Sequence, residues 1–168
     1  MIATCRRRRA GAGVLVVVVG LAGCRQPDGD IPSPTDDQEN QIGDIARDLQ
    51  NVAAGRAEGP SELYDDLYNL TDPAPPRNLL DTVAETLETA LAGTSPSDAA
   101  ARQVADALFI VHRVRELSER QIEELGTELQ LALLAAGADE DRALAAAAAA
   151  REFQTAMTVN RRRWYQLF

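Results

Sequence analysis

The sequence predicts an all-α protein, a small helical bundle of about five helices with a long C-terminal helical hairpin, preceded by a signal peptide and a disordered tether. Three observations support this prediction. Beyond residue 38, apolar residues recur every three to four positions, and no segment alternates as a strand would. Glycine and proline clusters separate these apolar stretches. Residues 25–38 are rich in proline and acidic side chains and lack any apolar periodicity.

The first 24 residues have the layout of a removable export signal. Arg6–Arg9 form a positive region, and residues 10–22 form an apolar run shorter than the roughly 20 residues that a spanning helix needs. Small residues then precede a cysteine in Leu21-Ala22-Gly23-Cys24.

This tetrapeptide resembles the lipobox of bacterial lipoprotein precursors. The resemblance covers residues 1–24 only. It implies that residues 1–23 are removed and that Cys24 carries a thioether-linked diacylglycerol, in many bacteria with a further acyl chain such as palmitate. Two or more chains would hold the protein durably in a membrane. The alternative is a plain secretory signal or an uncleaved anchor with a chance cysteine.

The predicted organisation has three parts: the signal peptide at 1–23, the lipidated Cys24 with a flexible tether at 24–38, and an α-helical domain at 39–168. Fourteen tether residues reach roughly 45 Å at about 3.3 Å each. The folded domain can therefore stand away from the bilayer.

Charge and cysteine content exclude several kinds of partner. The chain has 17 basic and 26 acidic residues, and without Arg6–Arg9 the formal net charge is −13. Such an acidic chain is not expected to bind nucleic acid, which requires a basic surface. Cys5 and Cys24 are the two cysteines, so the chain after Cys24 holds no thiolate ligand and no disulfide.

The first three predicted helices are separated by strong breakers. Gly55 and the Gly59-Pro60 pair follow the first helix, the proline-rich residues 71–76 follow the second, and Gly93 suits the left-handed position after the third. The expected helices span residues 38–54, 61–70 and 77–92. Their apolar faces comprise Ile42, Ile45, Ala46, Leu49, Val52, Ala53, Leu63, Tyr64, Leu67, Tyr68, Leu80, Val83, Ala84, Leu87 and Leu91.

A fourth helix is expected to begin after Ser95, with Pro96 at its first position, and to continue to Ala136. A helix of that length would be about 60 Å long, more than a bundle of this size needs. Gly126 is therefore expected to bend it, or part of it binds a partner. Its apolar face comprises Val104, Leu108, Val111, Val114, Ile122, Leu125, Leu129 and Leu133.

The last helix should form an antiparallel hairpin with the fourth across a turn at Gly137. Asp139 caps it, and it runs to about Arg162. The alanines of residues 145–150 would allow close approach to a neighbouring helix. Its apolar face comprises Ala146, Ala149, Phe153, Met157 and Trp164.

Nothing in the sequence predicts an enzyme. His112 is the single histidine and lies among apolar residues, which is typical of a packed or surface side chain. The acidic residues near it alternate with arginines, as on a solvated helix face. We therefore expect no catalytic residues, no metal site and no cofactor.

The C-terminal segment is the one candidate contact site. Its three arginines and three aromatics fall within eight residues: Arg161, Arg162, Arg163, Trp164, Tyr165 and Phe168. One interpretation is contact with anionic headgroups, and another is docking to a partner protein. The structural alternative is that the arginines complement the helix dipole while the aromatics cap the core.

Two classes of function fit these observations. The first is a non-catalytic helical adaptor or scaffold of the cell envelope, anchored to the membrane through Cys24 and bound to another envelope protein. The second is a carrier or sensor that binds an apolar ligand in the periplasm. Few aromatics and an alanine-rich last helix favour close packing over a large pocket, and hence the first class. Lipoproteins that are retained in the inner membrane of many proteobacteria carry aspartate directly after the lipidated cysteine. In this chain Arg25 follows Cys24. The resemblance therefore implies the periplasmic face of the outer membrane if the source is Gram-negative.

Overall fold

In a computed structural model, residues 34–56, 61–71, 76–113 and 117–165 are described, with the backbone alone at 61–62, 112–113 and 159–165. The regular structure of these residues is entirely helical, which confirms the predicted fold class. The described helices number six rather than about five. They are α1 (Asp36–Ala53), α2 (Ser61–Leu70), α3 (Arg77–Leu91), α4 (Asp98–Arg113), α5 (Glu119–Ala135) and α6 (Glu140–Tyr165).

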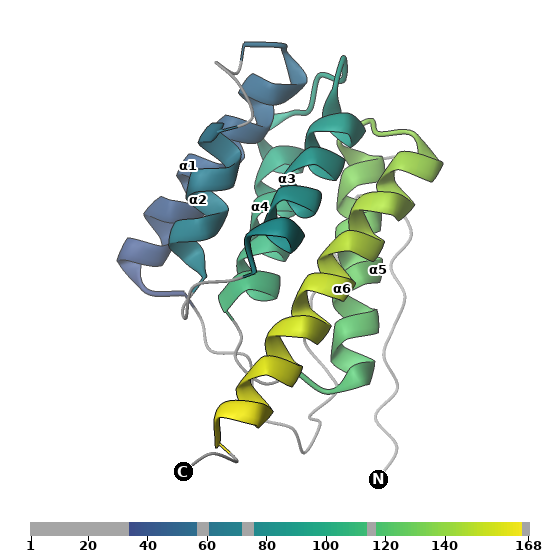
Figure 1. Ribbon diagram of the computed structural model, residues 1–168. Coiled ribbons are helices and arrows are strands. Elements are labelled where there is room, and N and C mark those ends of the chain that lie inside the picture. Colours follow the sequence, from purple (N-terminus) through teal and green to yellow (C-terminus); the bar gives the residue numbers. More distant parts are fainter. Residues whose placement is uncertain (1–33, 57–60, 72–75, 114–116, 166–168) are drawn as a thin grey trace, which may run out of the picture. The chain divides into compact units, whose positions relative to one another are not determined.

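The helices of residues 31–168 pack as two layers of three (Figure 1). In one layer α3 lies between α2 and α6, and in the other α4 lies between α1 and α5. Between the layers, the α5–α6 hairpin makes the most extensive contact, and α1 packs on α2. The predicted C-terminal hairpin is therefore confirmed, with α5 in place of the last part of a longer helix.

One hydrophobic core runs through both layers. The described residues of each predicted apolar face are buried or pack against this core. Val114 and Trp164 belong to those faces but lie outside the described side chains. The largest fully buried side chains are Ile42, Ile45, Leu49, Leu63, Leu67, Leu70, Leu80, Leu87, Leu91, Leu108, Leu129 and Phe153.

The fourth predicted helix is two helices, so the expectation of one continuous helix from Ser95 to Ala136 was wrong. α5 begins after Ser118, whose hydroxyl accepts the Gln121 N–H at 3.3 Å while the Gln121 side chain accepts the Ser118 N–H at 2.9 Å. This reciprocal capping box stabilises a new helix start. The break falls before Ser118, and Gly126 lies inside α5.

The start of α4 also differs from the prediction. Ser97, not Ser95, accepts the Ala100 N–H, at 3.3 Å, and α4 begins at Asp98. Pro96 therefore precedes the helix. Its carbonyl and the Asp98 carboxylate instead accept hydrogen bonds from the Gln50 amide, which ties α1 to the start of α4.

The α5–α6 turn has the geometry that its sequence predicts. Gly137 has φ +93°, a left-handed conformation that glycine adopts without steric cost. The Ala138 N–H donates to the Leu133 carbonyl at 3.0 Å, as in a Schellman motif. The Asp139 carboxylate then accepts the Asp141 N–H at 3.1 Å, which confirms Asp139 as the cap of α6. The chain thus reverses within four residues and sets α6 antiparallel to α5.

Candidate functional site

The residues that the sequence singled out lie at or beyond the edges of the described structure. Cys24 lies outside the described residues. Arg161, Arg162, Arg163, Trp164 and Tyr165 form the last turn and a half of α6, described by their backbone alone, and Phe168 lies outside. The prediction that the last helix ends near Arg162 is three residues short. The candidate contact segment is therefore mostly helical and continuous with α6.

Among the described side chains of α6, the last buried one precedes that segment. Phe153 and Met157 are buried, and Met157 is the last residue of α6 whose side chain is described as buried. Before Met157, buried and exposed residues alternate along α6, because one side of the helix packs on α3 and α5. The candidate segment begins four residues, or about one helical turn, beyond Met157.

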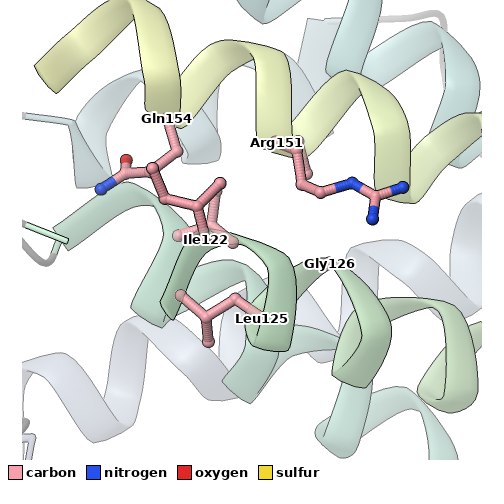
Figure 2. Close-up of a pocket in the computed structure, with 7 residues that line it drawn as sticks. Ile122, Leu125, Gly126, Arg151 and Gln154 are labelled. Atoms are coloured by element: carbon pink, nitrogen blue, oxygen red, sulfur yellow. The ribbon is translucent and has the colours of Figure 1, made fainter. Parts of the chain in front are cut away.

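α5 and α6 approach closely at a glycine, as Figure 2 shows. The Arg151 side chain of α6 lies across Gly126 of α5, and a Cβ added to Gly126 would lie 2.6 Å from Arg151 Cδ. Arg151 Nη1 then donates to Glu123 Oε2 at 2.8 Å. The α6 residues that pack here are mainly alanines, as the sequence predicted. Ala143, Ala146, Ala147 and Ala150 are all buried.

The apolar crevice at this contact is closed. Its lining comprises Val111, Ile122, Leu125, Gly126, Ala150, Arg151 and Gln154 (Figure 2). It has no room for a water molecule. Apolar ligand sites in proteins usually enclose at least 300 Å³. This part of the bundle therefore offers no ready cavity for an apolar ligand.

A second hollow lies between α1 and α2 and is polar. It has a volume of about 110 Å³ and is lined by Gln41, Asp44, Ile45, Asp66 and Asn69. Burial, a hydrogen bond with Asp48 and the charges of Asp48, Asp44 and Asp65 together raise the pKa of Asp66 to about 7. This cluster was not predicted from the sequence. The signal was available, since Asp44 and Asp48 lie four residues apart on one helix face and Asp65-Asp66 is a like-charged pair.

Three leucines are exposed in the α5–α6 hairpin, and we refer to them as the hairpin leucines. Leu131 and Leu134 lie three residues apart on α5 and are 59% and 37% exposed, while Leu144 in the second turn of α6 is 47% exposed. Scattered exposed leucines are ordinary on a protein surface. These three, however, are the large hydrophobic side chains left exposed among the described residues, and all belong to one hairpin. They were not predicted from the sequence, because apolar periodicity identifies the leucines of the buried stripe only.

Among the described residues, no three His, Cys, Asp or Glu side chains are grouped so that they could hold a metal ion. Within the same residues, no helix combines the length and apolar character required to cross a membrane. The His112 side chain is not among those described.

Comparison of the chain with protein-family models, with curated proteins and with solved structures gave no significant match.

Proposed function

We propose that this protein is a membrane-anchored bacterial lipoprotein and that its helical bundle is a non-catalytic adaptor that binds another protein of the cell envelope. The observation that carries the proposal is the order of features at the N-terminus: Arg6–Arg9, a short apolar run, Leu-Ala-Gly-Cys ending at Cys24, and a proline-rich segment. Lipid on Cys24 would hold the domain at the membrane, on the periplasmic face of the outer membrane in a Gram-negative cell.

The character of the bundle supports an adaptor over a carrier of apolar ligands. The crevice between α5 and α6 has no room for water, and alanines bring the two helices together. A carrier would have to open this contact, at the cost of unburying Phe153 and Leu129. An adaptor needs only an accessible surface.

The hairpin leucines form the surface that we favour for contact with the partner protein. Apolar side chains contribute most of the binding energy at the centre of protein interfaces, whereas charged residues are depleted there. The C-terminal segment, which continues α6 from the same hairpin, supplies arginines and aromatics of the kind that anchor such interfaces. We place the partner contact on the hairpin, with contact to anionic headgroups as the alternative role of the C-terminal segment.

Site-specific photocrosslinking in cells tests the adaptor. A photoreactive residue is placed at Leu131 or at Leu144, and at the exposed Asp81 of α3 as the matched control. We expect both leucine positions to trap one discrete product and Asp81 to trap none. The Cys24→Ser variant should lose the product, because an unanchored domain no longer meets its partner at the membrane.

Two results would contradict the adaptor. One is equal capture at Asp81 and at the leucines, which indicates nonspecific collision. The other is release of an extractable lipid or other apolar molecule from the purified protein together with no crosslinked protein. That result would favour the carrier.

A further inference from the structure

The hairpin leucines lie on one outward side of the α5–α6 hairpin. Arg151 of α6 reaches across to Glu123 of α5 in a 2.8 Å ion pair, and the Glu123 side chain is 71% exposed, so this pair marks a side of the hairpin that faces solvent. Leu144 lies seven residues, or about two helical turns, before Arg151, and Leu134 lies eleven residues, or about three turns, after Glu123. Both leucines therefore project to the same side as the pair. Leu131 precedes Leu134 by three residues and is its neighbour on the α5 surface.

Alanines extend this surface, and no charge interrupts it. Ala135 of α5 and Ala148 of α6 each lie four residues after a hairpin leucine, and both are exposed. Residues 129–138 and 143–150 contain no charged side chain. We refer to the hairpin leucines together with these two alanines as the apolar patch. An exposed apolar patch with a polar border is typical of an interaction site.

Three acidic residues border the apolar patch, and we refer to them as the acidic rim. Glu128 lies three residues before Leu131 and is half-buried, while Glu140 and Asp141 are exposed and lie four and three residues before Leu144. About one helical turn separates each carboxylate from its leucine. Among the described side chains, none of the three rim carboxylates forms an ion pair.

The two arginines of α6 that are nearest to the patch in sequence do not balance the acidic rim. Arg142 Nη1 donates to the Thr89 carbonyl oxygen of α3 at 3.3 Å, so its guanidinium lies toward α3. Arg151 is already paired with Glu123. Even with Arg142 counted, the charge around the apolar patch is negative.

This negative charge discriminates between the possible occupants of the patch. Two copies of the chain joined through the same patch would set one acidic rim against the other, and like charges that meet across an interface reduce affinity. An anionic membrane surface repels the rim in the same way. The complementary occupant has an apolar centre flanked by positive side chains. An amphipathic α-helix presents both, and it packs lengthwise against a pair of helices.

We propose that the apolar patch binds a cationic amphipathic helix of the partner protein. Apolar side chains of that helix pack on the hairpin leucines, and its Lys or Arg side chains face Glu128 and Glu140. This inference rests on the proposed adaptor function and specifies the chemistry of the partner. The apolar contact supplies most of the affinity, and the acidic rim selects for positive charge.

Photocrosslinking of the full chain in cells tests this proposal when it is combined with charge reversal. A photoreactive residue at Leu144 is combined with Glu128→Arg and Glu140→Arg, or with Asp81→Arg and Glu85→Arg at exposed positions of α3 as the matched control. Both pairs change the net charge by the same amount. We expect the rim pair to lower the yield of the crosslinked product about tenfold, since each exposed charge contact contributes modestly. The control pair should leave the yield unchanged.

Two further measurements separate a charge effect from damage to the fold. Glu128→Gln with Glu140→Gln removes the charges without reversing them and should lower the yield about threefold, while circular dichroism of each variant should show unchanged helicity. Mass spectrometry of the wild-type product should map the crosslink to a segment with apolar residues every three to four positions and Lys or Arg beside them. Replacement of those Lys or Arg residues by Glu should restore capture by the Glu128→Arg, Glu140→Arg variant.

Failure of this proposal differs from failure of the adaptor function. If no discrete protein product forms at Leu144 in the wild type, the adaptor function is wrong and the cationic helix with it. If the product forms but keeps its full yield in the rim variants, or maps to an acidic segment, to a second copy of this chain or to lipid, the cationic helix alone is overturned.

Discussion

Arg151 of α6 lies directly over Gly126 of α5, so that a side chain at position 126 would have to displace Arg151. A Cβ at 126 would lie 2.6 Å from Arg151 Cδ and 2.7 Å from Arg151 Cγ. The arginine could swing away, but it would then lose its 2.8 Å contact with Glu123. The effect of a side chain at position 126 therefore depends on which residue occupies position 151.

A double-mutant cycle at this pair tests the relationship. Gly→Ala inside a helix normally stabilises by about 1 kcal/mol. We expect Gly126→Ala to give that gain in an Arg151→Ala background but to be roughly neutral in the wild type, where Arg151 must be displaced. Urea denaturation of the four proteins measures the coupling, expected to be about 0.5–1 kcal/mol. Additive effects would show that Arg151 does not constrain position 126.

A second prediction separates the buried and exposed faces of α5. Leu129 is 0% exposed and Leu131 is 59% exposed. Leu129→Asp places an unpaired charge in the core and should destabilise the protein by several kcal/mol. Leu131→Asp makes the same chemical change two residues away and should alter stability by less than about 0.5 kcal/mol. Thermal unfolding monitored by circular dichroism compares them. Similar losses in both variants would contradict the register of α5.

The sequence was sufficient to predict the apolar faces of the helices but not how many helices carry them. The described positions that repeat every three to four residues from Val104 to Leu133 are buried along both α4 and α5, because both helices pack on the same core. A continuous stripe therefore does not reveal a break. The second helix starts at the capping box of Ser118 with Gln121, a local signal that the prediction did not consider.

The sequence is sufficient to propose only those candidate sites whose residues are neighbours along the chain. The lipobox and the basic-aromatic segment can be read along the chain. The acidic cluster around Asp66 brings together residues of α1 and α2 and depends on their packing, and so does the exposure of Leu131. Local patterns carry no information on which partner a surface side chain meets in the folded protein.

A third prediction concerns Glu88 of α3. One of its carboxylate oxygens is buried and has no hydrogen-bond partner, and burial together with the charge of Glu85 raises its pKa. A raised carboxyl pKa favours folding below the ordinary pKa, and this contribution is lost as pH rises through the folded-state pKa. Glu88→Gln should therefore match the wild type near pH 4 and be more stable near pH 8.

The expected gain at pH 8 is a few tenths of a kcal/mol, because Glu88 is partly exposed and solvent screens its charge. Glu85 is an exposed neighbour on the same helix, and Glu85→Gln should change the free energy of unfolding less than Glu88→Gln does. Urea denaturation at both pH values measures these differences. If Glu88→Gln were less stable than the wild type at pH 8, its charge would have a stabilising partner instead.

A fourth prediction concerns the C-terminal segment. If the segment is a contact site, removing residues 161–168 should leave helicity and melting temperature nearly unchanged. The truncation should weaken capture of the partner, or of anionic liposomes if the segment contacts headgroups. A loss of stability near the 3–5 kcal/mol typical of a deleted core aromatic would show instead that Trp164 caps the bundle. Emission from Trp164, the single tryptophan, distinguishes these outcomes independently.

The proposed lipid anchor is the central claim, and its most direct test is metabolic labelling with a clickable fatty acid. In the proposed anchor the thiol at position 24 accepts the diacylglycerol, so the wild-type protein should become labelled and fractionate with membranes. Cys24→Ser should carry no label, while Cys5→Ser, within the proposed signal peptide, should be labelled as the wild type. Label that persists on Cys24→Ser, or its absence from the wild type, would contradict the anchor.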